Sequence, residues 1–254
     1  MIPLLRGWTA VQRTAANNVR LGVTLTFVAG ATNAGGFLAV GQYTSHMTGI
    51  VSSMADNLVM GQAYLALAGL ASLLAFIGGA MTTAWMVNWA LRRKLQSAYG
   101  RPLLLEAALL LLFGLFGSGI RFLAVLFVPL TVLVLCFIMG LQNAVITKIS
   151  RAEIRTTHIT GLVTDLGIEL GKLFYINRLT REQMVVGNRK KLRLLGKLIG
   201  SFFVGGLLGA LGFKTIGFFT TVPLSVLLLL LVWRPVLNDA RNWIGPPHPG
   251  QDQD

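Results

Sequence analysis

The sequence predicts an all-α membrane protein with about six transmembrane helices, two short half-helices and a 3+3 inverted repeat. Three observations lead to this prediction. Hydrophobic residues make up 54% of the chain and charged residues only 12%, about half the charged fraction of a typical soluble domain. Long apolar stretches follow one another, with most basic residues in the short segments between them. A motif that begins at residue 44 also recurs at residue 156.

Six stretches have the apolar character of a membrane span, which requires about 20 residues. Two shorter, more polar stretches, Met47–Gly61 and His158–Tyr175, are expected to be half-helices that do not cross. The predicted organisation is an N-terminal segment (1–20), a first repeat (21–120), a second repeat (121–235) with a basic loop (177–197), and a disordered tail (236–254). The six predicted spans are Leu21–Val40, Tyr64–Leu91, Leu103–Gly119, Phe122–Thr147, Leu198–Phe213 and Thr215–Trp233.

The basic residues predict the side of the membrane that each connection faces. With the N-terminus inside, segments 1–20, 92–101, 148–197 and 234–254 face the cytoplasm and hold 20 of the 22 Lys and Arg residues. This matches the positive-inside rule, so both termini are predicted to be cytoplasmic. If Met47–Gly61 alone also crossed, the cluster Arg92–Lys94 would move outside, and we reject that topology. Glu106 and Arg121 lie near span ends, where we expect their charged groups to reach the interface.

The repeat is detected at three landmarks that occur in the same order in both halves. Thr44–Ser52 aligns with Thr156–Thr164, with five of nine residues identical. Because each half contains three spans, the second half must be inverted, an arrangement that recurs in secondary transporters. The other two landmarks pair Gly30–Ala34 with Gly140–Ala144 and Phe76–Gly79 with Phe203–Gly206, the last pair being expected as helix-packing faces.

The repeated motif supplies the candidate binding site. Ser45 and Thr157 are predicted to be N-caps of the half-helices, because hydroxyls accept from exposed backbone N–H groups. A helix that begins inside the membrane presents N–H donors and a partial positive charge. Two such ends predict a pocket for an anion or a carboxylate-bearing solute. The candidate binding residues are Asn33, Ser45, His46, Thr48, Gly49, Asn143, Thr157, His158, Thr160, Gly161 and Asp165.

Each group of candidates also has a simpler interpretation. Thr and Gly in membrane helices often serve only close packing and interhelical hydrogen bonds. His46 and His158 either relay protons or form structural hydrogen bonds. Asn33 and Asn143 either line the site or pin the half-helices. Asp165, with its neighbours Glu169 and Lys172, fits a local ion-pair network at least as well as a binding role.

Other features restrict the class of function. The net charge is +13, but the basic residues do not share one soluble face, so we exclude nucleic-acid binding. The sequence contains no Walker A loop, dinucleotide fingerprint, HExxH motif or Cys/His cluster with metal spacing. We therefore expect a protein that is not an enzyme and that uses no cofactor and no metal.

The motifs resemble those of the YoaK-like family of bacterial membrane proteins, a domain-of-unknown-function family, over about residues 20–235. The resemblance implies a protein of the bacterial cytoplasmic membrane and supplies no substrate. In that family an aspartate usually stands at the position of Asn33. The most specific segments are Gly140–Ala144, Arg155–Gly161, Thr164–Gly167 and Ser45–Gly49.

The leading functional hypothesis is a small secondary transporter or permease for a small polar or anionic solute. Its site would lie between the N-termini of the two half-helices. The alternatives are a passive channel lined by the same donors and a non-transporting scaffold or regulatory subunit. The expected partners are the lipid bilayer, the solute and, in a homo-oligomer, further copies of the chain.

Overall fold

The computed structural model describes residues 8–11, 13–117, 124–150, 153–176 and 184–244, and these residues form helices and connecting turns without a strand. Each predicted span and each predicted half-helix coincides with one helix, with ends shifted by up to about ten residues. The helices are α1 (Ala15–Val40), α2 (Met47–Val59), α3 (Ala63–Arg92), α4 (Gly100–Phe116), α5 (Ala124–Ser150), α6 (Ile159–Leu173), α7 (Arg189–Ile216), the short 3-10 helix η4 (Gly217–Thr220) and α8 (Thr221–Ile244).

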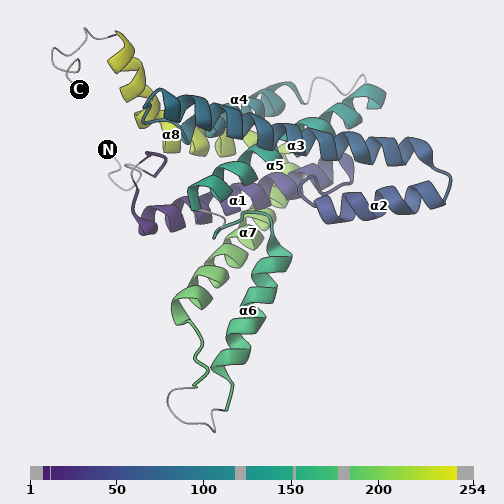
Figure 1. Cartoon of the computed structure of the whole chain (residues 1–254). Coiled ribbons are helices and arrows are strands. Elements are labelled where there is room, and N and C mark those ends of the chain that lie inside the picture. Colours follow the sequence, from purple (N-terminus) through teal and green to yellow (C-terminus); the bar gives the residue numbers. More distant parts are fainter. Residues whose placement is uncertain (1–7, 12, 118–123, 151–152, 177–183, 245–254) are drawn as a thin grey trace.

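The helices pack as three principal pairs. Helix α1 lies along α7, α3 lies along α5, and α4 lies along α8, while α1 and α5 meet between the first two pairs. The short helices α2 and α6 pack on α3 and α7 respectively, and these two hairpins extend from the helical body in different directions (Figure 1). The hairpins are largely exposed, since only Ile50 of α2 and Leu162 and Glu169 of α6 are buried.

The first two pairs cross at glycines that leave no room for a side chain. A β-carbon built on Gly140 of α5 would collide with the carbonyl oxygen of Phe76 in α3, and one on Gly79 would collide with that of Phe137. The α1–α7 pair has the same arrangement at Gly30 and Gly205, against the backbones of Phe202 and Phe27. Such backbone contact maximises van der Waals packing, which drives helix association in lipid. These helix-packing faces were expected, but Phe203 is 68% exposed, so Phe202 is the residue at the contact.

Segments from both ends of the chain meet at one end of the molecule. The Thr9 hydroxyl donates to the carbonyl oxygen of Leu231. The Asp239 carboxylate accepts from the backbone N–H groups of Gln96 and Ser97, at 3.0 and 2.8 Å, in the α3–α4 connection. The beginning of α1 and the end of α8 lie at this end in Figure 1.

The surface is that of a membrane-type helical protein. Four helical stretches of the described residues are long and apolar enough to cross a membrane. The fourth, Arg189–Arg241, is bent at Gly217, which has a positive φ of 62°. Helix α3 presents an apolar stripe that is 39–82% exposed, the kind of surface that marks contact with a membrane or a partner. The stripe consists of Leu67, Leu70, Leu74, Ile77, Met81 and Trp85.

Two predicted irregular segments are partly helical. The tail was expected to be disordered from residue 236, but α8 continues to Ile244 because Asp239 anchors it to the α3–α4 connection. The basic loop was expected to reach residue 197, but α7 begins at Arg189, where the Asn188 side chain accepts from the N–H groups of Lys190 and Lys191. Residues 245–254 and Arg121 lie outside the described residues.

The packing at the crossing glycines can be tested with two substitutions in α7. Gly205→Ala should lower the free energy of unfolding by about 1–3 kcal/mol, because the new methyl group overlaps the α1 backbone. Gly200→Ala is the matched control, since no atom lies within 4 Å of a β-carbon there. Alanine at Gly200 should be neutral or stabilising by up to about 1 kcal/mol. Thermal unfolding of the purified protein measures both changes, and equal melting temperatures for the two variants would contradict this packing.

Candidate functional site

Each half-helix is attached to the preceding long helix by an asparagine. The Asn33 side-chain oxygen accepts from the backbone N–H of Ser45 at 3.2 Å and from its hydroxyl at 2.9 Å. The Asn143 oxygen accepts from the hydroxyls of Thr156 and Thr157, at 3.3 and 2.9 Å. The two asparagines therefore pin the loops that lead into α2 and α6.

The half-helices α2 and α6 do not have the N-cap residues that the sequence predicted. The N-cap residues are His46 and His158, and neither side chain caps its helix. Ser45 and Thr157 were expected to be the caps, but their hydroxyls are engaged by the two asparagines. The error has a physical reason: a hydroxyl that donates to a buried amide oxygen is held away from the N–H groups of the first turn.

The motif glycines accommodate the histidine rings. A β-carbon on Gly49 would collide with the ring of His46, and one on Gly161 would collide with the ring of His158. Both histidines are exposed. The spacing of His and Gly in the motif thus lets an imidazole fold back over the first helical turn in both halves.

Both half-helices begin beside these rings with backbone donors that have no intrahelical acceptor. The first intrahelical bonds run from the N–H of Ile50 to the oxygen of His46 at 3.0 Å and from the N–H of Leu162 to the oxygen of His158 at 3.1 Å. The N–H groups of residues 47–49 and 159–161 precede these bonds and therefore lack an intrahelical acceptor. Thr48 and Thr160 in these turns are exposed.

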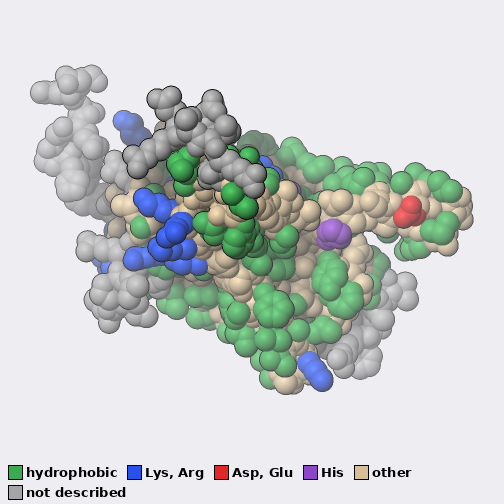
Figure 2. All heavy atoms as spheres, turned by 90° about the horizontal axis from the view of Figure 1, so that it is seen from below, with side chains coloured by type: hydrophobic (Ala, Val, Ile, Leu, Met, Phe, Trp, Pro, Cys, Tyr) green, Lys and Arg blue, Asp and Glu red, His purple; other side chains and the backbone are tan. Residues whose placement is uncertain are grey.

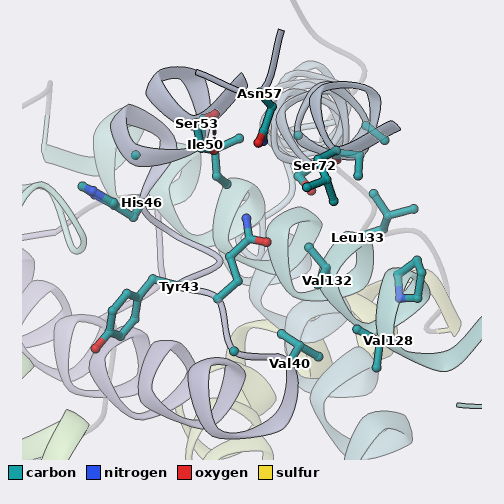
Figure 3. A pocket seen from close by; sticks show the side chains of 18 of the residues that line it. Val40, Tyr43, His46, Ile50, Ser53, Asn57, Ser72, Val128, Val132 and Leu133 are labelled. Atoms are coloured by element: carbon teal, nitrogen blue, oxygen red, sulfur yellow. Dashed lines mark hydrogen bonds between the residues drawn. The ribbon is translucent and has the colours of Figure 1, made fainter. Parts of the chain in front are cut away.

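A cavity of about 580 Å³ lies beside the first half-helix, between α2, α3, the α1–α2 loop and the beginning of α5. Ile50, Asn57 and Val132 point into it, and the rings of Tyr43 and His46 lie at its edge (Figure 3). Among the described residues, its lining includes uncharged polar side chains and no Asp, Glu, Lys or Arg. The polar lining residues are Gln42, Tyr43, His46, Ser53, Asn57, Tyr64 and Ser72.

The second half-helix carries ion pairs on the face toward α7. The carboxylate of Glu169 accepts from Lys172 at 2.9 Å and from the backbone N–H of Asn188 at 2.8 Å, and Lys191 lies 3.4 Å from Asp165. The hydrogen bond from Asn188, followed by that from Lys172, lowers the pKa of Glu169. The ion-pair network expected from the sequence is therefore present, and Asp165 belongs to it.

The structure thus separates the predicted site residues into three groups. His46 and Gly49 line the cavity. Asn33, Ser45, Asn143 and Thr157 hold the loops together. The remaining predicted residues do not line this cavity: Thr48, His158, Thr160, Gly161 and Asp165.

Sequence analysis missed a buried polar pair. Glu106 was expected to reach the membrane interface, but its side chain is completely buried and its Oε1 accepts from the Gln142 amide at 2.8 Å. The expectation was wrong because the α4 surface that carries Glu106 faces α5, and proximity to a span end does not report which way a side chain points. Gln142 stands next to the motif residue Asn143, which was the only available signal.

Comparison with known proteins identifies the family. A family model described as a protein of unknown function (DUF1275) matches residues 21–233. The chain belongs to this family. The match is consistent with the YoaK-like resemblance, whose motifs include both half-helix N-termini. No curated protein and no solved structure matches the chain.

The role of Asn33 can be tested with two substitutions. Asn33→Leu should lower the free energy of unfolding by about 1–3 kcal/mol, because both donors of Ser45 lose their acceptor. Asn33→Asp is the matched control, since a carboxylate oxygen accepts the same two hydrogen bonds. Thermal unfolding, with protease cleavage of the 41–46 loop, measures the effect. A leucine variant as stable and as resistant as the wild type would show that Asn33 does not pin the loop.

Proposed function

We propose that this protein is a transporter or permease of the bacterial cytoplasmic membrane that binds a small polar or anionic solute. The cavity beside α2 is the observation that carries the proposal. Its volume of about 580 Å³ falls in the range of small-molecule sites, roughly 300–1,000 Å³. The N-terminus of α2, the ring of His46 and uncharged polar side chains surround it, and these donors favour a neutral or negative solute.

We further propose that the six long helices span the membrane as an inverted repeat. In this scheme α1, α2 and α3 correspond to α5, α6 and α7. The packing supports it, because exchanging the halves converts the α1–α7 pair into the α5–α3 pair and the α2–α3 hairpin into the α6–α7 hairpin. Gly79 and Gly205 make equivalent backbone contacts, with Phe137 and Phe27, so we align these two glycines, whereas the sequence comparison aligned Gly79 with Gly206.

The arrangement of charges supports cytoplasmic termini. The N-terminal segment, the α3–α4 connection and the end of α8 lie together. Most Lys and Arg side chains visible in Figure 2 gather on the left of the view, the end at which α1 begins and α8 ends in Figure 1. The positive-inside rule assigns that end to the cytoplasm. The α2–α3 hairpin and its cavity then face the outer side.

Differences between the halves favour the first as the binding half. Under the repeat, Ser53 and Asn57 of α2 correspond to Asp165 and Glu169 of α6. In the second half these carboxylates pair with Lys191 and tie the two helices of the hairpin together. In the first half the corresponding side chains are uncharged and line the open cavity. We therefore propose that the solute binds beside the first half-helix, α2, and not between the N-termini of both half-helices.

Adjacent serines of α2 provide a matched test. Both serines are exposed, but Ser53 lines the cavity and Ser52 does not. An aspartate at Ser53 should weaken anion binding by about 100-fold, since two unit charges about 6 Å apart at an effective dielectric constant of 20 repel by about 3 kcal/mol. Ser52→Asp adds the same charge and should change affinity much less. Binding is measured by thermal stabilisation of the purified protein in a screen of anions and neutral metabolites.

Flux measurements in proteoliposomes separate the functional classes. A transporter accumulates the bound solute against its gradient when a driving ion is supplied, and Ser53→Asp reduces that uptake. Flux that only dissipates the gradient would indicate a channel. Equal loss of binding in the Ser52 and Ser53 variants would contradict a site in this cavity, and a protein that neither binds nor conducts any solute would be a scaffold.

A further inference from the structure

Two buried side chains at the α4–α5 contact each have one polar atom that forms no hydrogen bond with the described residues. Glu106 of α4 and Gln142 of α5 are both completely buried. The Gln142 amide nitrogen donates to Glu106 Oε1 at 2.8 Å. The remaining polar atom of each side chain, Oε2 of Glu106 and Oε1 of Gln142, is also buried and has no hydrogen-bond partner among the described residues. Buried polar atoms without partners are rare, so each requires an explanation.

One proton on the Glu106 carboxylate accounts for both oxygen atoms, because it allows them to bond to each other. An ionised carboxylate only accepts hydrogen bonds, whereas a protonated one also carries an O–H donor. A proton on Glu106 Oε2 supplies a donor, and the unpartnered Gln142 Oε1 on the same two side chains supplies an acceptor. An acid and a primary amide then join through two complementary hydrogen bonds. Other proteins also hold a carboxylic acid neutral in an apolar site so that it can donate a hydrogen bond.

Within the part of the chain that the structure describes, no charged group forms an ion pair with Glu106. Helix α4 packs against α3, α5, η4 and α8. Within the described residues, none of the ionisable groups of these elements bonds or pairs with Glu106. Arg101 of α4 bonds the Ser97 hydroxyl, Lys148 of α5 bonds Asn88, and Asp239 of α8 accepts from the α3–α4 connection. The other ionisable groups on these elements are Tyr64, Arg92, Cys136, Arg234 and Arg241.

We propose that Glu106 and Gln142 form a proton-binding site. Protonation of Glu106 stabilises the packing of α4 against α5. Binding converts the carboxylate to the acid and adds the second hydrogen bond. Release leaves a carboxylate oxygen facing an amide oxygen in an apolar contact, which favours separation of the helices. Ionisable groups inside membrane proteins commonly mark proton pathways.

Helix α4, which responds to this proton, is hydrogen-bonded to α8. Ser225 and Thr221 of α8 donate to the carbonyl oxygens of Ala107 and Leu110 in α4, at 2.6 and 2.7 Å. Helices α4 and α8 are therefore joined beside Glu106, and loss of the proton displaces them together. Neither Glu106 nor Gln142 lines the cavity beside α2, so this site stands apart from the proposed solute site.

Infrared spectroscopy of the purified protein tests the proposal directly. The wild type should show the carbonyl stretch of a protonated carboxylic acid at neutral pH, shifted in D₂O, and Glu106→Gln should remove that band. Gln142→Leu should shift its frequency, because the acid loses both hydrogen bonds to the amide. This second variant assigns the band if Glu106→Gln does not fold. Absence of an acid carbonyl band from wild-type protein at neutral pH would overturn the proposal.

The stability of the protein against pH provides a second readout. Folding holds Glu106 protonated, whereas the unfolded chain ionises it above about pH 4.3, so the melting temperature should fall as the pH rises above about 5. Glu106→Gln should form two hydrogen bonds between its amide and that of Gln142, match the wild type near about pH 4, and lack this fall. An identical pH profile in both proteins would overturn the proposal. The infrared band and the pH dependence of the melting temperature do not depend on solute transport. They therefore test this proposal separately from the proposed function.

Discussion

Backbone contact between helices at four glycines is the constraint on which the rest of this structure depends. Lipid removes most of the hydrophobic driving force between membrane helices, so close van der Waals packing has to provide it. Gly79 and Gly140 bring α3 onto α5, and Gly30 and Gly205 bring α1 onto α7. These contacts join the second long helix of each half, α3 or α7, to the first long helix of the other half. The two halves therefore interlock, and neither can form its principal contacts alone.

The interlocking also determines where the half-helices lie. Asn33 and Asn143 each stand three residues after a crossing glycine, and each binds the loop that precedes a half-helix. A half-helix thus leaves the body close to the point where the two halves meet. From this common arrangement the halves diverge: the second hairpin is held by ion pairs around Lys191, and the first contains an open polar cavity.

The sequence predicted the repeating elements well because their signals are periodic or repeated. Apolar length predicted the long helices, and the pattern Ser/Thr-His-x-Thr-Gly predicted two similar half-helices. Their capping was predicted wrongly because the competing acceptor for Ser45, the amide of Asn33, lies in another helix. The burial of Glu106 and the anchoring of Asp239 were also missed. Both depend on contacts between distant segments, and a single sequence carries no signal for such partners.

The central claim is that the two interlocking halves insert in opposite orientations. Single cysteines at Gln62, between α2 and α3, and at Tyr175, after α6, test it most directly, with the buried Cys136 replaced by serine. Intact cells are treated with a membrane-impermeant thiol reagent. The account predicts that the cysteine at position 62 is labelled from outside and that the one at position 175 is labelled only after permeabilisation. Labelling of both positions from the same side would contradict the inverted arrangement.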